Sequence, residues 1–336
     1  MKRTELIYSY PESLIATEPS RPSRVLFVSL NQDPVEMTIQ ELIQQIPGGD
    51  CFVINKTKVL KRRMFAEGEV EVLFLDQISG NLVSNNWKVL FPSKKIPIGS
   101  RLNLPGGFVM TLIEKGRPQS VEVSPPITEI DFEKWAEIPL PPYIQKARHS
   151  RHNVPEDEKW YQTAWAEKPG SFAAPTASLH FTENDLMQLQ KKGVEVIELT
   201  LHVGLGTFLP VVTEDLNDHP MHEENYHINI EDWGKIKKAK KERKGIWSLG
   251  TTSTRVLESV ARTEILTGST NILLQVGSEF KIVNRLLTNF HQPESTLLAL
   301  VAGYAGLEKM KKCYAYAVAK EFKLFSYGDL SVWIKE

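Results

Sequence analysis

Residues 61–145 interrupt the alternation of strand and helix patterns that the rest of the chain shows, and this interruption limits the possible folds more than any other feature. Short segments that alternate apolar and polar residues follow one another there, with turns rich in glycine and proline between them. They lie at 69–75, 87–91, 101–104, 108–113 and 121–123. Strands this close together, without helices between them, are typical of a small barrel or sandwich. We therefore predict a small all-β barrel domain inserted at 61–145.

Strand and helix patterns alternate on both sides of the interruption. Thr38 followed by Glu41 is a capping box that predicts a helix over 38–46. Further helices are predicted at 182–193, 231–244, 254–266, 295–306 and 308–323, and strands at 24–30, 51–55, 194–203, 246–250 and 271–276. This alternation predicts an α/β domain of residues 1–60 and 146–336, with a mostly parallel sheet and helices on both faces. Ligands of such folds bind at the carboxyl ends of the strands.

The composition is that of an ordinary globular protein, with 41% hydrophobic and 24% charged residues among 336. The net charge of −1 gives no overall attraction to nucleic acid, so RNA contact requires a local basic patch. Cys51 and Cys313 suggest no disulfide framework, which fits a cytoplasmic protein. The longest apolar run, 296–306, is shorter than the roughly 20 residues that cross a bilayer, so we predict a buried helix and no membrane contact. The oligomeric state stays open, with a monomer favoured.

Four polar segments each carry a histidine, and most of them adjoin a predicted strand. The segments are 173–182, 200–211, 221–226 and 288–296, and the histidines are His180, His202, His222 and His291. Imidazole suits proton transfer because its ordinary pKa lies near neutrality. A single histidine is more often a hydrogen-bonded structural residue, but four in similar contexts predict at least one acid or base. Glu223 and Asp329 are alternative candidates, and the sequence does not rank the six.

No metal motif is present, since His222-Glu223-Glu224 lacks the H-E-x-x-H spacing that places two ligands on one helix face. We predict no metal cofactor. The segment 250–255 lies between a predicted strand and a predicted helix, where backbone N–H groups favour a carboxylate or phosphate. Its candidate binding residues are Thr251, Thr252, Ser253 and Arg255. The alternative is a plain capping turn with Ser253 or Thr254 as the cap.

Basic residues flank the predicted insertion on both sides. One cluster contains Lys58, Lys61, Arg62 and Arg63, and the other contains Lys146, Arg148 and Arg151. Phosphate binding is favoured at such clusters, so we predict that both contact RNA. The basic run 235–244 is interpreted instead as the solvated face of a helix.

Taken together, these segments resemble the S-adenosylmethionine:tRNA ribosyltransferase-isomerase family of queuosine biosynthesis. The matching segments occur in the family's order and extend over nearly the whole chain. They are 10–16, 139–144, 170–182, 200–211, 221–226, 250–255, 287–296 and 325–329. The resemblance implies an α/β domain with an inserted β-barrel. It also implies that substrate contacts lie in these segments, at Thr176, Gly204, Gly206, Thr207, Phe208, Tyr226 and Asn289 in addition to those in 250–255.

The resemblance implies a specific reaction. The ribosyl part of S-adenosylmethionine, a co-substrate, moves to 7-aminomethyl-7-deazaguanine at the wobble position of tRNA. Epoxyqueuosine forms, and adenine and methionine leave. Two other functions stay open, namely a diverged tRNA-binding paralogue without activity and an unrelated S-adenosylmethionine-dependent methyltransferase.

Overall fold

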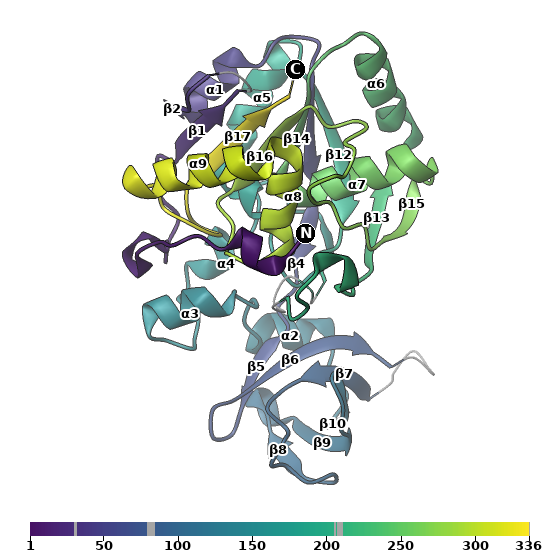
Figure 1. Cartoon of the computed structure of the whole chain (residues 1–336). Helices are drawn as coiled ribbons and strands as arrows, with labels where there is room; N and C mark the ends of the chain where they lie inside the picture. Colours follow the sequence, from purple (N-terminus) through teal and green to yellow (C-terminus); the bar gives the residue numbers. More distant parts are fainter. Residues whose placement is uncertain (30–31, 79–84, 205, 207–210, 336) are drawn as a thin grey trace. The chain divides into compact units, whose positions relative to one another are not determined.

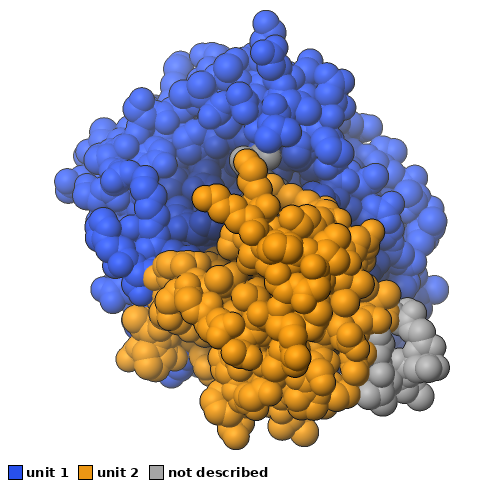
Figure 2. Space-filling model, turned by 90° about the horizontal axis from the view of Figure 1, so that it is seen from below, with its two compact units in different colours: residues 1–59, 141–150, 159–336 blue, residues 60–140, 151–158 orange. Residues whose placement is uncertain are grey.

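The computed structural model describes residues 1–29, 32–78, 85–204, 206 and 211–335, which form two compact units (Figures 1 and 2). Unit 1 comprises Met1–Val59, Pro141–Ser150 and Lys159–Glu336, and unit 2 comprises Leu60–Leu140 and Arg151–Glu158. The domain boundaries predicted around 61–145 stay a prediction. Within the described residues, no helix is long and apolar enough to cross a membrane.

Unit 1 is built on a nine-stranded sheet in the order β15-β13-β12-β3-β14-β16-β17-β1-β2. Its strands are β1 (Arg24–Val28), β2 (Val35–Thr38), β3 (Cys51–Asn55), β12 (Glu195–Leu201), β13 (Glu224–Ile228), β14 (Ile246–Leu249), β15 (Thr267–Thr270), β16 (Arg285–Asn289) and β17 (Leu330–Ile334). A separate parallel pair joins β4 (Thr57–Val59) to β11 (Lys168–Ser171).

The prediction of a mostly parallel sheet is wrong. The central strands β12, β3, β14 and β16 are parallel, but β13, β15 and β2 pair antiparallel with their neighbours, and so do β16 and β17. For two of these pairs the connection is the reason: no helix is predicted between β12 and β13 or between β1 and β2, and strands joined without a crossover return antiparallel. The strands β16 and β17 are antiparallel although two helices, Thr296–Ala305 and Leu307–Ala319, lie between them in the chain. The strand predicted at 271–276 is also wrong, because the strand there is Thr267–Thr270.

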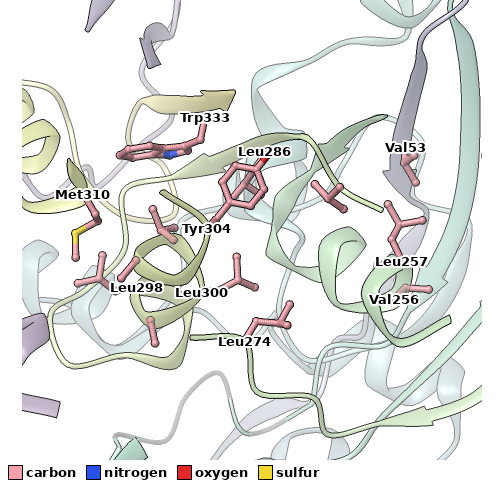
Figure 3. Close-up of a cluster of buried hydrophobic side chains, with 14 of the residues drawn as sticks. Val53, Val256, Leu257, Leu274, Leu286, Leu298, Leu300, Tyr304, Met310 and Trp333 are labelled. Atoms are coloured by element: carbon pink, nitrogen blue, oxygen red, sulfur yellow. The ribbon is translucent and has the colours of Figure 1, made fainter. Parts of the chain in front are cut away.

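Helices cover both faces of the sheet, as predicted. One face packs against α6 (Ile230–Lys241), α7 (Gly250–Thr263), α8 (Thr296–Ala305) and α9 (Leu307–Ala319), and the other against α1 (Ile39–Gln45) and α5 (Glu183–Lys191). A hydrophobic core lies on each face of the sheet, and the fully buried strand β3 contributes to both. Val53 packs in the core on the first face and Phe52 in the core on the second. Figure 3 shows part of the first core.

Side-chain caps begin several helices of unit 1 where they were predicted. Thr38 and Glu41 form the capping box of α1, and Ser295 caps the apolar helix α8. The predicted cap of α7 is wrong. Leu249 is the N-cap, and Ser253 donates its hydroxyl back to the Leu249 carbonyl oxygen at 2.9 Å. The segment 250–253 is therefore already helical, with its backbone N–H groups at the start of α7.

Unit 2 contains a six-stranded antiparallel sheet in the order β5-β6-β7-β10-β9-β8. The strands are β5 (Arg63–Ala66), β6 (Val70–Gln77), β7 (Asn86–Leu90), β8 (Arg101–Asn103), β9 (Val109–Glu114) and β10 (Gln119–Ser124). Just beyond β5, the amide of Glu67 donates to the carbonyl oxygen of Asn103 at 2.9 Å, so the sheet is nearly closed.

The prediction that this part of the chain is all-β is incomplete, because unit 2 also contains the helix α2 (Glu129–Trp135). Thr128 and Asp131 form its capping box. Its Phe132 ring packs with the rings of Phe74 and Trp87 at centroid distances of 5.1 and 5.3 Å. The other α-helices of the described residues are α3 (Pro142–Arg148), which belongs to unit 1, and α4 (Asp157–Trp160), whose residues are divided between the two units.

Glu258 on α7 holds the segment 281–283, which leads into β16. Its carboxylate is fully buried and accepts from the amides of Lys281, Ile282 and Val283 at 2.8–3.0 Å. In Glu258→Ala these amides lose their acceptor, and each unmet group costs about 1–3 kcal/mol. We therefore expect a loss of at least about 3 kcal/mol in the free energy of unfolding, measured with urea. Glu183→Ala, at the exposed start of α5, is the control, and equal losses in the two variants would contradict this role of Glu258.

Candidate active site

A cavity of about 430 Å³ opens in unit 1 at the carboxyl ends of β12, β14 and β16. Val203 lines it just after β12, Thr251 just after β14, and Asn289 at the last position of β16. Because the three strands are parallel, their ends meet at one edge of the sheet. Of the predicted site residues, the cavity brings together His222, His291, Thr176, Gly206, Thr251, Thr252, Arg255 and Asn289.

A buried ion pair forms part of the cavity wall. Arg255 of α7 contacts Glu224 of β13 through Nη1, and the side chains of both residues are less than one-tenth exposed. The other oxygen of Glu224 accepts from the amide of Gly204 at 3.0 Å. Two further nitrogens of Arg255, Nε and Nη2, and the hydroxyl of Thr252 are buried without a hydrogen-bond partner among the described residues.

His291 lies in a buried part of the wall, with 8% of its surface exposed. Its Nε2 is 2.7 Å from the hydroxyl of Thr288, and its backbone is held by the hydroxyls of Tyr8 and Tyr314. Burial lowers the pKa of His291 to about 3. The ring is therefore neutral at neutral pH, because charging it would require removing an imidazolium from water.

His222 differs from His291 because its side chain is exposed. It lines the cavity beside Gly206, and a Cβ at Gly206 would lie 2.8 Å from Cδ2 of His222. Glycine at position 206 therefore lets the imidazole lie against the backbone. His219, which also lines the cavity, has its pKa lowered by burial and by the neighbouring His222.

His180 is not among the cavity-lining residues, although it holds one of them. Its Nε2 is 3.0 Å from the amide nitrogen of Asn289, and its Nδ1 is 2.7 Å from the hydroxyl of Ser23. The Ser23 hydroxyl donates to the carbonyl oxygen of Ser20, so it accepts from Nδ1–H, and Nε2 accepts from Asn289. Burial lowers the pKa of His180 to about 3, which fits this neutral tautomer.

His202 also lies outside the cavity lining. Its Nδ1 is 2.9 Å from the hydroxyl of Thr57, which in turn is 2.6 Å from the hydroxyl of Ser171. A Cβ at Gly170 would lie 2.6 Å from Nδ1, so the glycine allows this close packing. Burial lowers the pKa of His202. These contacts tie β4 and β11 to the end of β12.

Other predicted site residues are not among the residues that line the cavity, and most of them bond to backbone groups. Asp329 accepts from the amides of Arg24 and Lys323 at 3.0 and 2.7 Å, and burial raises its pKa. Glu223 is exposed and accepts from Ser269. The remaining members of this group are Gly204, Tyr226 and Ser253, which bond to Glu224, Ile265 and Leu249. The predicted residues Thr207 and Phe208 lie outside the described residues.

Sequence reasoning missed several cavity residues, of which Glu224 is the most consequential. In β13, residues Glu224, Tyr226 and Ile228 point to the buried side and Asn225 and His227 to the exposed side. Tyr226 and Ile228 are apolar and two positions apart, and the same alternation continued toward the N-terminus places Glu224, and not Glu223, on the buried side. This pattern was the signal in the sequence for choosing Glu224. Thr288 and Glu294 were not singled out either, although they lie in the predicted segment 288–296. Arg3 and His219 were also missed, and nothing in their local sequence connects them with the cavity.

The predicted RNA-contacting residues differ in how available their charges are. In unit 2, Arg63 is 1% exposed and pairs with Glu137 at 2.7 Å, and Arg62 is 6% exposed and pairs with Glu129 at 2.6 Å. These two do not form an exposed basic patch, which corrects that part of the prediction. Lys61 pairs with Glu158, Arg151 with Glu71, Lys146 with Glu12, and Arg148 donates to the Thr17 carbonyl oxygen. Lys58 is exposed.

No group of three or more histidine, cysteine, aspartate or glutamate side chains in the described part of the chain is arranged to hold a metal ion. The histidines of the cavity instead contact hydroxyl groups and glycine. The polar groups that line the cavity include imidazoles, threonine hydroxyls, the side-chain amide of Asn289 and the buried ion pair of Arg255 with Glu224.

The chain is similar to known proteins over nearly its whole length. The profile of a family described as queuosine biosynthesis protein matches residues 3–333. S-adenosylmethionine:tRNA ribosyltransferase-isomerases from Sulfurihydrogenibium sp. and Staphylococcus haemolyticus are 36% and 38% identical to the chain, over 98% of it and 98% of each relative. A crystal structure of S-adenosylmethionine tRNA ribosyltransferase from Thermotoga maritima matches with 27% identity and a TM-score of 0.56, over 98% of this chain and 100% of that one.

The low pKa of His291 predicts that acid destabilises the protein. Between its folded pKa of about 3 and its ordinary value near 6.5, the unfolded chain binds a proton that the folded chain does not. The free energy of unfolding should therefore fall as pH falls through this window, by roughly 1.4 kcal/mol per pH unit for this residue. Urea unfolding at several pH values should show a slope smaller by that amount in His291→Gln. Thr288→Val, which keeps the imidazole, should keep the slope, and an unchanged slope in His291→Gln would contradict the prediction.

Proposed function

We infer the roles of the cavity residues from one premise: the chain belongs to the queuosine biosynthesis protein family. It is an enzyme, a transferase-isomerase that uses S-adenosylmethionine and tRNA. We propose 7-aminomethyl-7-deazaguanine at the wobble position as the acceptor and epoxyqueuosine as the product. The observation that supports this most is the cavity itself, because segments of the chain that resemble the family meet there, at the edge where such sheets bind ligands.

The reaction requires a base and an acid. The sulfonium of S-adenosylmethionine makes the hydrogens on the adjacent C5′ acidic, so a positioned base can begin the sequence by removing one of them. Adenine then leaves, and its nitrogen takes up a proton. The tRNA amine attacks the resulting sugar, and an epoxide closes as methionine leaves. Each proton transfer assisted by a side chain is worth roughly 10²–10⁴ in rate.

His222 is the proposed base, because its exposed side chain lines the cavity beside Gly206 and is open to a ligand there. Burial lowers the pKa of His291 to about 3, which opposes its protonation at neutral pH. His291 is proposed to act as a neutral hydrogen-bonding group, fixed by Thr288 and by the tyrosines that hold its backbone. His180 is proposed as a positioning residue that orients the amide of Asn289.

The acceptor tRNA is proposed to contact exposed basic side chains rather than the buried arginines. Lys58 and Lys146 of unit 1 are exposed, and Lys146 shares a surface ion pair with Glu12 that a phosphate can replace at little cost. Arg62 and Arg63 are proposed to hold unit 2 together through Glu129 and Glu137. With tRNA as its substrate, the protein is proposed to act in the cytoplasm, as a monomer.

Product analysis tests the activity. We expect the protein, incubated with S-adenosylmethionine and tRNA that carries the precursor base, to release adenine and methionine and to form no methylated nucleoside. Chromatography of the small molecules separates the alternatives. S-adenosylhomocysteine as the main product would indicate a methyltransferase, and no product together with tRNA binding would indicate a paralogue without activity. Either result would overturn the proposed reaction.

Kinetics of histidine variants test the proposed base. His222→Gln should keep its thermal midpoint and its affinity for S-adenosylmethionine, while single-turnover adenine release falls by roughly 10²–10⁴. His227→Gln is a matched control, because His227 is an exposed histidine five residues further along the chain that is not among the cavity-lining residues and contacts Thr267. If His222→Gln releases adenine within twofold of the rate of the control, a difference of roughly 0.4 kcal/mol in activation free energy, His222 is not the base.

A further inference from the structure

Two residues on the first two turns of α7 line the cavity and carry three buried polar atoms. None of these three atoms has a hydrogen-bond partner among the described residues. They are Nε and Nη2 of Arg255 and the hydroxyl oxygen of Thr252. Arg255 is only 8% exposed, and the two residues are three positions apart, so they lie on the same side of the helix. Buried donors of this kind are normally satisfied in a folded protein. A ligand that accepts hydrogen bonds would complete them.

The charges of the cavity indicate which kind of ligand this is. Each arginine of the described lining is paired with a glutamate, Arg255 with Glu224 and Arg3 with Glu294, and the described lining contains neither lysine nor aspartate. A lone anion such as phosphate would therefore leave an uncompensated charge beside a buried, neutralised pair. The α-amino-acid end of a molecule carries both signs, so it adds no net charge.

We propose that Glu224, Arg255 and Thr252 bind the α-amino-acid end of S-adenosylmethionine, an inference that rests on the proposed function. The carboxylate accepts from the unpartnered nitrogens of Arg255 and from the Thr252 hydroxyl. It also lies at the N-terminus of α7, a helix of 14 residues whose dipole favours a negative group. The ammonium donates to the carboxylate of Glu224, which keeps its contacts with Arg255 and with the amide of Gly204. This end of the substrate then fixes where the sulfonium lies in the cavity.

Binding of S-adenosylmethionine and of its decarboxylated form, measured by calorimetry, tests the proposal. The unmodified protein should bind S-adenosylmethionine at least about tenfold more tightly, because charge-assisted hydrogen bonds to the carboxylate are lost in the analogue. Thr252→Val should reduce this preference by about threefold, and Arg255→Lys, which keeps a positive charge beside Glu224, should reduce it further. Thr263→Val is the matched control, since its hydroxyl bonds to the Ser259 carbonyl oxygen at the other end of α7.

Equal affinities of the unmodified protein for the two compounds would overturn the proposal. An unchanged preference in Thr252→Val, with weaker tRNA binding, would overturn it in favour of a tRNA phosphate at this position. Because binding is measured without tRNA, the result is separate from the test of activity. A protein with the expected preference that releases no adenine would support the subsite and refute the proposed reaction.

Discussion

The buried contact between Arg255 and Glu224 is the interaction on which the cavity depends. It joins α7, which follows the central strand β14, to the antiparallel strand β13 on the far side of β12. Removing one partner would leave the other charge buried and unpaired, which costs several kcal/mol, about 3–5 in measured cases. The same carboxylate holds the amide of Gly204, so one ion pair also fixes the chain where it leaves β12.

A second polar cluster, free of formal charge, ends the central strand β3. The side-chain amide of Asn55 donates to the carbonyl oxygen of Leu201 and accepts from the amides of Leu201 and Thr57. The Thr57 hydroxyl then continues to Ser171 and His202. Since Asn55 is fully buried, each of these groups must find its partner within the protein. The cluster therefore holds β12, β3, β4 and β11 in register at the edge where the cavity opens.

Charge in a sequence and charge on a surface are different properties, and unit 2 shows why. Lys61, Arg62 and Arg63 are consecutive, which favoured an RNA-binding patch. Arg62 instead lies over the Phe132 ring at 4.3 Å and pairs with Glu129, and Arg63 pairs with Glu137. The acidic partners come from the end of unit 2 that is 67 to 74 residues away along the chain, so local sequence could not reveal them.

Local interactions let the sequence alone determine the longer helices of unit 1 and several of its strands. Thr38 with Glu41 and Ser295 with Leu298 cap helices within one turn, and the apolar run Cys51–Asn55 is a strand with the predicted bounds. The resemblance of its motifs also identified the family. Only tertiary structure decided the direction of β17, and which of the predicted histidines line the cavity. The physical reason is distance along the chain: Asn289 meets His180 across 109 residues, and Arg255 meets Glu224 across 31, and no periodicity encodes such pairings.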